Sequence, residues 1–182
     1  MKTLIALLLT TLFILSCDNS TNEKSLPGID APLDPFEQNI ALGRGINLGN
    51  VLEAPNEGEW GVVLKAEWFT FIKNAGFNSV RIPIKWSAHT IDEDPFTINE
   101  EFFSRVDWAI EQALKNDLMV IINMHHYDEI FVTPAQESEK FLSIWEQISL
   151  RYKNQPKELL FEINYCLSVL QKYEPIIRTE PS

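Results

Sequence analysis

The sequence is poor in cysteine and in basic residues, and each shortage excludes a class of protein. Its 182 residues include only two cysteines, Cys17 and Cys166, so no disulfide framework is expected and the fold must depend on its core. Fifteen basic residues stand against 26 acidic ones, which gives a formal net charge of −11. So acidic a chain is repelled by phosphate backbones and anionic lipid, and we expect no nucleic-acid partner.

Motifs for metal binding and for serine hydrolysis are also missing. The three histidines are His89, His125 and His126, and no cysteine cluster or His-x-His pair accompanies them. Adjacent residues on a strand point to opposite faces, so His125 and His126 cannot both bind one metal ion unless the chain bends there. No Gly-x-Ser-x-Gly segment marks a nucleophile elbow. We therefore predict neither a metal site nor a cofactor.

What the sequence does contain begins with a targeting signal. Lys2 precedes an apolar run at residues 4–15, which is too short to cross a bilayer as a helix but suits a secretory signal. The segment Ile14-Leu15-Ser16-Cys17 resembles a bacterial lipobox. We expect residues 1–17 to be a lipoprotein signal peptide, with Cys17 lipidated and the protein secreted to the outer membrane or cell surface. An ordinary signal peptide with an incidental cysteine is the alternative.

Strands and helices are expected to alternate after a polar, proline-containing linker at residues 18–36. Apolar or alternating runs predict strands near residues 45, 80, 120 and 160. Their period of about 35–40 residues is typical of βα units. Four such units make half of an eight-stranded barrel or most of a small doubly wound sheet, and this pattern leaves both open.

Local sequence features define three of these expected elements in more detail. The first strand is expected within residues 40–50, where glycines allow close backbone approach. The helix at about 65–75 is expected to bury Trp68, Ile72 and Ala75. Asn99 is a plausible N-cap for the next helix, whose apolar stripe is Phe103, Val106, Ile110 and Ala113.

Polar side chains recur where the expected strands end. In chain order they are Asn47 and Asn50, Arg81, His125 and Asn164. In a parallel α/β fold these ends converge on one rim, and burying such groups unpaired costs about 1–3 kcal/mol each. Taken singly, the arginine suits a structural ion pair and the asparagines suit turns. Together with the histidine they predict a binding or catalytic site.

A family likeness rests on three segments: Gly43 to Asn50, Gly76 to Ile84 and Val120 to His126. In this order and spacing they resemble the first three strands of glycoside hydrolase family five, the cellulase-type (β/α)₈ barrels. The resemblance implies that residues 37–164 form the N-terminal half of a (β/α)₈ TIM barrel, with about four βα units. It also implies retaining hydrolysis of β-1,4-glucans without metal or cofactor.

The resemblance assigns roles to individual side chains. It implies that Arg81 supports the catalytic nucleophile and that His125 contacts the sugar just before the scissile bond. Asn47 and Asn50 match the floor of the cleft, and Asn164 matches the asparagine ahead of the acid/base. The neighbouring residues expected to line sugar subsites are His126, Tyr127 and Trp86.

The sequence departs from the family at the end of the fourth strand. The family has Asn-Glu-Pro there, and its Glu is the general acid/base, but Tyr165 or Cys166 occupies that position here. Neither replaces a carboxylic acid, and retaining hydrolysis needs two carboxyl groups about 5–5.5 Å apart. Glu162 matches a separate family glutamate and is expected to be structural. The nucleophile would lie on a later strand, which this sequence does not contain.

We therefore expect residues 165–182 to be a non-family tail produced by a frameshift or truncation, and the chain itself to be inactive. The expected partner is a β-glucan, with membrane contact only through the lipid anchor. The alternative from another class is a non-catalytic surface lipoprotein that binds carbohydrate.

Overall fold

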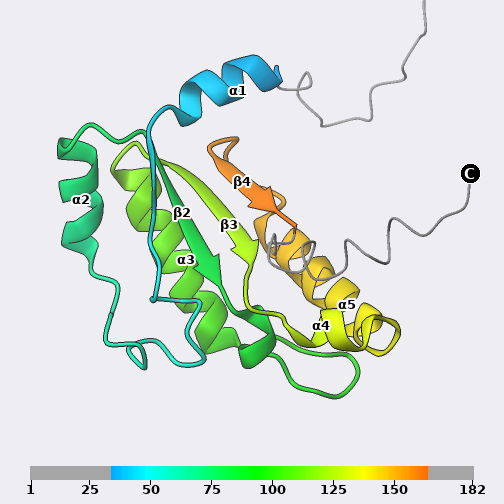
Figure 1. Cartoon of the computed structure of the whole chain (residues 1–182). Helices are drawn as coiled ribbons and strands as arrows, with labels where there is room; N and C mark the ends of the chain where they lie inside the picture. Colours follow the sequence, from blue (N-terminus) through cyan, green and yellow to red (C-terminus); the bar gives the residue numbers. More distant parts are fainter. Residues whose placement is uncertain (1–33, 164–182) are drawn as a thin grey trace, which may run out of the picture. The chain divides into compact units, whose positions relative to one another are not determined.

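The computed structural model describes residues 34–163, which form a sheet of parallel strands packed against helices (Figure 1). The strands are β1 (Gly45–Asn47), β2 (Ser79–Ile84), β3 (Met119–Met124) and β4 (Leu159–Glu162). The helices are α1 (Pro35–Leu42), α2 (Ala66–Asn74), α3 (Glu100–Lys115), α4 (Glu129–Val132) and α5 (Pro134–Tyr152), with a 3₁₀ turn η1 at Trp86–His89.

The strands lie side by side in their sequence order. The sheet order is β1-β2-β3-β4 and every neighbouring pair is parallel. A doubly wound sheet reverses its strand order at a switch point, whereas a barrel adds each strand beside the previous one and keeps its helices outside. Of the two architectures that the spacing allowed, the observed order is that of a barrel segment.

The core lies between the sheet and the helices. Alternate residues of the two central strands have no exposed surface: Val80, Ile82, Ile84, Val120, Ile122 and Met124. Helix α3 covers them with the stripe predicted from the sequence, and all four of its members are buried: Phe103, Val106, Ile110 and Ala113. Because side chains alternate along a strand, the odd-numbered residues are left for the opposite, inner face.

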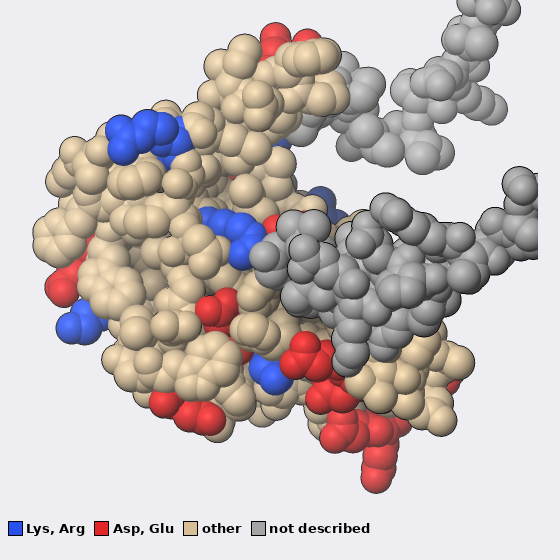
Figure 2. All heavy atoms as spheres, viewed as in Figure 1, with Lys and Arg blue, Asp and Glu red and all other residues tan. Residues whose placement is uncertain are grey.

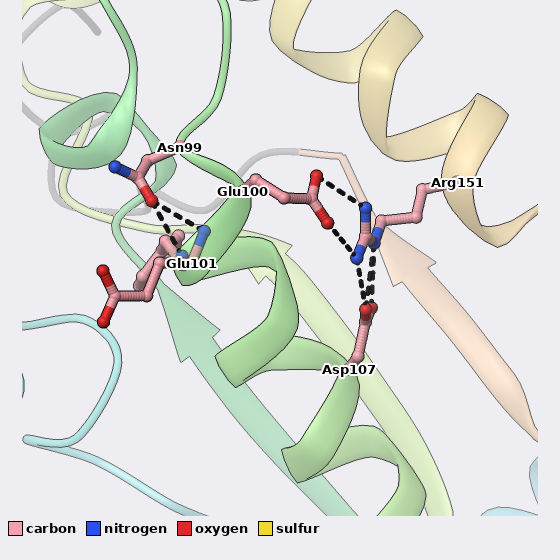
Figure 3. A network of polar contacts seen from close by, with 6 residues as sticks. Asn99, Glu100, Glu101, Asp107 and Arg151 are labelled. Carbon is pink, nitrogen blue, oxygen red and sulfur yellow. Dashed lines mark hydrogen bonds and ion pairs between the residues drawn. The ribbon is translucent and has the colours of Figure 1, made fainter.

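Helix α3 begins where its sequence predicts, and Arg151 of α5 binds it from the side (Figure 3). The Asn99 side chain accepts hydrogen bonds from the backbone N–H groups of Glu101 and Phe102, at 2.8 and 3.1 Å, which confirms the predicted N-cap. Arg151 on α5 donates hydrogen bonds to the carboxylates of Asp107 and Glu100, which both lie on α3. The hydrogen bonds that Arg151 donates to Asp107 raise the pKa of the guanidinium, so this link between α3 and α5 stays charged.

The first element differs from its prediction. Residues 35–42, expected to hold the end of a linker and the start of a strand, form helix α1, and β1 is only Gly45–Asn47. Asp34 caps α1 by accepting the Phe36 N–H at 2.8 Å, and Pro35 occupies the first helical position. An acidic cap followed by proline is a helix start signal, and it outweighs the apolar run that suggested a strand.

Helix α2 buries a different stripe from the predicted one. Its buried residues are Phe69 and Ile72, while Trp68 is only partly buried and Ala75 is exposed beyond the helix end. Phe69 packs edge-on against Trp108 of α3 with ring centroids 6.3 Å apart. That contact turns the helix by about one residue relative to the sequence prediction.

Arg105 ties the long loop between β1 and α2 to helix α3. Its guanidinium donates to both carboxylate oxygens of Glu57, at 2.7 and 2.8 Å, and to the Leu64 carbonyl at 2.8 Å. The Leu64 N–H donates back to Glu57 at 2.8 Å, and the guanidinium lies 4.0 Å from the Trp108 ring centroid. Burial opposes ionisation of Glu57, but the hydrogen bonds from Arg105 and the Leu64 N–H outweigh it and hold the pKa of this carboxyl below its usual range.

Replacing Glu57 with glutamine is expected to destabilise the chain at neutral pH by about 1–3 kcal/mol, because a charged bidentate partner of Arg105 is lost. A carboxyl whose pKa is lowered on folding contributes stability above its unfolded pKa, and this contribution is lost as pH falls through the folded value. Urea unfolding of both proteins at pH 7 measures the stability lost in the variant. The same measurement at pH 3 shows whether the contribution of Glu57 is lost as the pH falls. Equal stability of Glu57→Gln and the parent at pH 7 would contradict this account.

Candidate functional site

Arg81 is the centre of a polar rim on the inner face of the sheet. It lies on β2, and its Nε and Nη2 donate to the two carboxylate oxygens of Glu162 on β4, at 2.8 and 3.1 Å. Its Nη1 donates to the Asn47 Oδ1 at the end of β1, at 2.7 Å. One guanidinium therefore joins β2 to β1 and β4, which are three of the four strands.

The Arg81–Glu162 pair joins strands that are not neighbours. Strand β3 lies between β2 and β4, and neighbouring strands are about 4.8 Å apart. Both side chains stand on the same face and converge across β3, which fits the concave side of a sheet that curves as in a barrel. Arg81 and Glu162 are 22% and 32% exposed, so the pair is partly shielded from water.

Glu162 is held in its ionised form. The hydrogen bonds from Arg81 lower its pKa, burial opposes this effect, and the Asn123 amide adds to the lowering. A general acid needs a raised pKa so that it carries a proton at neutral pH. Glu162 therefore does not suit that role, which fits the expectation that it is structural.

His125 ends β3 and faces the same rim. Its Nε2 lies 3.3 Å from a carboxylate oxygen of Glu53, and its Nδ1 lies 3.3 Å from the amide nitrogen of Asn123. Burial lowers the pKa of His125, and His126 and Arg81 lower it further against the opposing effect of the carboxylates Glu53 and Glu162. The imidazole is therefore neutral at neutral pH, able both to donate and to accept one hydrogen bond.

Glu53 is a site residue that sequence reasoning missed. It is 7% exposed and is flanked by the buried residues Leu52 and Ala54. A single acid inside an apolar loop segment was the available signal, because a buried carboxylate needs partners. The Asn50 N–H donates to its Oε1 at 2.6 Å, which fixes the carboxylate beside His125.

Gly49 and Asn50 make the tight turn that this arrangement needs. Asn50 has a positive φ of 63°, which asparagine tolerates better than most residues. A Cβ on Gly49 would lie 3.2 Å from the Asn47 amide nitrogen and 3.4 Å from Glu53 Oε1. A side chain there would press on both groups, so the glycine leaves room for them.

His126 lies beyond β3 and does not continue its alternation. Its φ of 51° turns the chain, so its ring packs edge-on against His125, with centroids 4.4 Å apart. The indole of Trp60, which is 41% exposed, lies 5.6 Å from the His126 ring centroid. The expectation that the two histidines point apart is therefore wrong, because the left-handed backbone at His126 breaks the strand geometry.

Two expected sugar-contacting aromatics are instead buried. Tyr127 is 2% exposed, and its hydroxyl donates to Glu137 of α5 at 2.7 Å. Trp86 has no exposed surface, and its Nε1 donates to the Asn123 carbonyl at 3.0 Å. Neither ring presents an exposed face within residues 34–163, so their sugar contacts stay predictions that this burial does not support. Adjacency in sequence to His125 or to β2 did not reveal which way these rings point.

Several predicted residues lie outside the described part of the chain. They are the lipidation candidate Cys17, the strand-end residue Asn164 and the residues at the acid/base position, Tyr165 and Cys166. The predicted signal peptide, most of the linker and the tail at 165–182 lie there as well.

Charge on the face shown in Figure 2 is mixed. Basic groups appear as separate small patches, with acidic groups near them and along the lower edge. Nucleic-acid binding needs clustered lysine and arginine, so this face offers no support for it. Within residues 34–163, no helix combines the length and apolar character needed to cross a membrane.

Solved structures share both the fold and the sequence of this chain. Thermotoga maritima Cel5A in complex with cellobiose is 57% identical with a TM-score of 0.70, over 71% of this chain and 42% of that one. The same enzyme in complex with mannotriose is 49% identical with a TM-score of 0.72, over 80% of this chain and 51% of that one. The sheet and its helices therefore correspond to about half of a known barrel, as the sequence resemblance implied.

Curated relatives agree with the structural likeness. Endoglucanase H of Acetivibrio thermocellus is 43% identical over 141 residues, which is 76% of this chain and 16% of that protein. Endoglucanase B of Clostridium cellulovorans is 34% identical over 124 residues, or 65% of this chain and 28% of that protein. The chain thus spans less than a third of either. The cellulase family model, glycosyl hydrolase family 5, matches residues 41–164. The chain belongs to this family of glycoside hydrolases.

Proposed function

We propose that this chain supplies the sugar-binding rim of an endoglucanase-type glycoside hydrolase, and that its ligand is a β-1,4-linked glucan. The observation that carries the proposal is the set of strand-end groups joined through Arg81, beside the neutral imidazole of His125. The cellobiose complex of the similar Cel5A supports a glucan as the ligand class.

The rim combines the two kinds of contact that sugars require. Donors and acceptors on Asn47, Asn50 and His125 suit hydroxyl groups, which bind through a few well-placed polar groups. The partly exposed Trp60 beside His126 adds an aromatic surface for the apolar face of a pyranose ring. A chain with both features is suited to bind an oligosaccharide along the rim.

We further propose that this chain binds glucan without cleaving it. Retaining hydrolysis needs a carboxylic acid at the acid/base position, where the sequence has Tyr165 or Cys166. The nearby Glu162 is kept ionised by Arg81 and is a poor proton donor. With this lack of catalysis, the chain would act as the non-catalytic carbohydrate-binding lipoprotein that the sequence left as the alternative, and it would use the same rim.

Calorimetric titration of the purified chain with cellopentaose is expected to show one binding event, without release of reducing ends. His125→Ala is expected to weaken the affinity at least about tenfold, because a hydrogen bond to a buried group is worth about 1–3 kcal/mol. Glu111→Gln, on the exposed surface of α3 and 58% exposed, is the matched control and should bind like the parent.

Equal binding by His125→Ala and the parent would contradict the proposed rim. Hydrolysis of cellopentaose by the parent would contradict the proposed lack of catalysis. Tighter binding of mannopentaose than of cellopentaose would change the ligand class to a β-1,4-mannan.

We also propose that Cys17 is lipidated and anchors the secreted protein at the outer membrane or cell surface. The support is the lipobox-like segment that follows the apolar run at residues 4–15. Expression of the full chain in a bacterium with labelled palmitate is expected to label the protein, and Cys17→Ser should abolish the label. Cys166→Ser, which removes the other cysteine, should keep it. A label that survives Cys17→Ser would refute the anchor.

A further inference from the structure

Glu53, His125 and His126 form a compact group of potential metal ligands. One ligand atom from each, a carboxylate oxygen and two ring nitrogens, lies within 4.8 Å of the others. Glu53 and His125 are nearly buried, at 7% and 9% exposed, and His126 is partly exposed. The group therefore combines two fixed ligands with one that solvent can reach.

We propose that these three side chains bind one divalent transition-metal ion, of which Zn²⁺ is the best-suited example. Two imidazoles and one carboxylate form a ligand set that holds zinc with a fourth position open. Imidazole favours zinc, copper, nickel and cobalt, whereas magnesium and calcium prefer sites made only of oxygen. The proposed site therefore discriminates between these two classes of cation.

The two buried ligands already stand at a suitable separation. The His125 Nε2 and Glu53 Oε2 atoms are 3.3 Å apart, as expected for neighbouring ligands each about 2.0–2.2 Å from one tetrahedral ion. The three ligand atoms together lie within 4.8 Å of one another, which is wider than the separation expected around one ion. The ring nitrogen of His126 must therefore move closer to the other two ligands. His126 lies beyond the strand and is partly exposed, so rotation of its side chain is the least costly adjustment.

The surroundings hold the first two ligands in place. The Asn50 N–H occupies Oε1 of Glu53 at 2.6 Å and leaves Oε2 turned toward His125. A histidine that binds metal through Nε2 usually donates its Nδ1–H to an acceptor. Asn123 Oδ1 is buried and has no hydrogen-bond partner among the described residues. Rotating the amide by a half-turn would place this oxygen beside His125 Nδ1, now 3.3 Å from the amide nitrogen, at the cost of the hydrogen bond that the amide makes with Glu162.

A simple hydrogen bond between His125 and Glu53 would account for only part of this geometry. It would not need His126 to adopt the left-handed backbone that sets its ring against His125. Non-glycine residues in that region often mark functional sites. The strongly acidic chain also raises the local concentration of cations.

The full chain, produced without a polyhistidine tag and stripped with EDTA, is titrated with Zn²⁺ in a calorimeter and with Co²⁺ by visible absorption. We expect one equivalent of either ion to bind, and no binding of Mg²⁺. Glu53→Gln and His126→Ala are expected to weaken Zn²⁺ binding at least about tenfold, since even residues that merely support metal ligands contribute 10–100-fold. The glutamine still accepts the Asn50 N–H, so this turn is retained.

His89→Asn is the control for histidine content, because His89 lies on η1 and stacks on Phe102 instead of joining the group. It should keep full Zn²⁺ affinity, and far-ultraviolet circular dichroism should show that all variants fold. Absence of a one-to-one event in the parent would overturn the proposal, as would equal affinity in the parent, Glu53→Gln and His126→Ala.

A consequence that rests on the proposed function is that metal and glucan exclude one another, because His125 serves both. Cellopentaose is expected to bind at least about tenfold more weakly once Zn²⁺ saturates the site. Unchanged affinity would overturn mutual exclusion while leaving the metal site intact. If cellopentaose binds neither form, the proposed function fails, and the Zn²⁺ titration still decides the metal site by itself.

Discussion

The bidentate bond between Arg81 and Glu162 is the constraint on which the rim depends. It joins β2 to β4 across β3, and a third donor of the same guanidinium holds Asn47 at the end of β1. Removing either partner would leave a charge on the inner face without its counter-charge, which is costlier than losing the pair together. The polar groups proposed to surround a ligand are thus positioned by an ion pair that need not itself touch it.

The packing of the sheet explains why these polar groups share one face. Val80 and Ile82 are buried under the helices, so Arg81 between them must project to the inner side. Parallel register then sets Arg81 opposite Ile121, and Asn123 opposite Glu162, with His125 just beyond the end of β3. The alternation that builds the core therefore also builds the rim, and the parallel direction of the strands brings all the carboxyl ends to the same edge.

The sequence alone predicted an element correctly wherever a single local pattern was present and no second signal favoured a different structure. The buried runs of β2 and β3, the stripe of α3 and its Asn99 cap were all predicted, because burial and capping are local and strong signals. Prediction failed at α1, where a capping signal competed with an apolar run, and at Phe69, whose burial depends on a contact with another helix. The backbone turn at His126 and the partners of Glu53 arise only from tertiary structure, so no spacing rule identified them.

A double-mutant cycle on Arg81 and Glu162 tests the central claim most directly. Urea unfolding at pH 7 of the parent, Arg81→Met, Glu162→Gln and the double variant gives the coupling between the two side chains. If this pair holds the rim, the single variants should each be destabilised and the coupling should reach about 1 kcal/mol or more. Effects that add to within about 0.3–0.5 kcal/mol would show that the two residues act independently and would contradict the account.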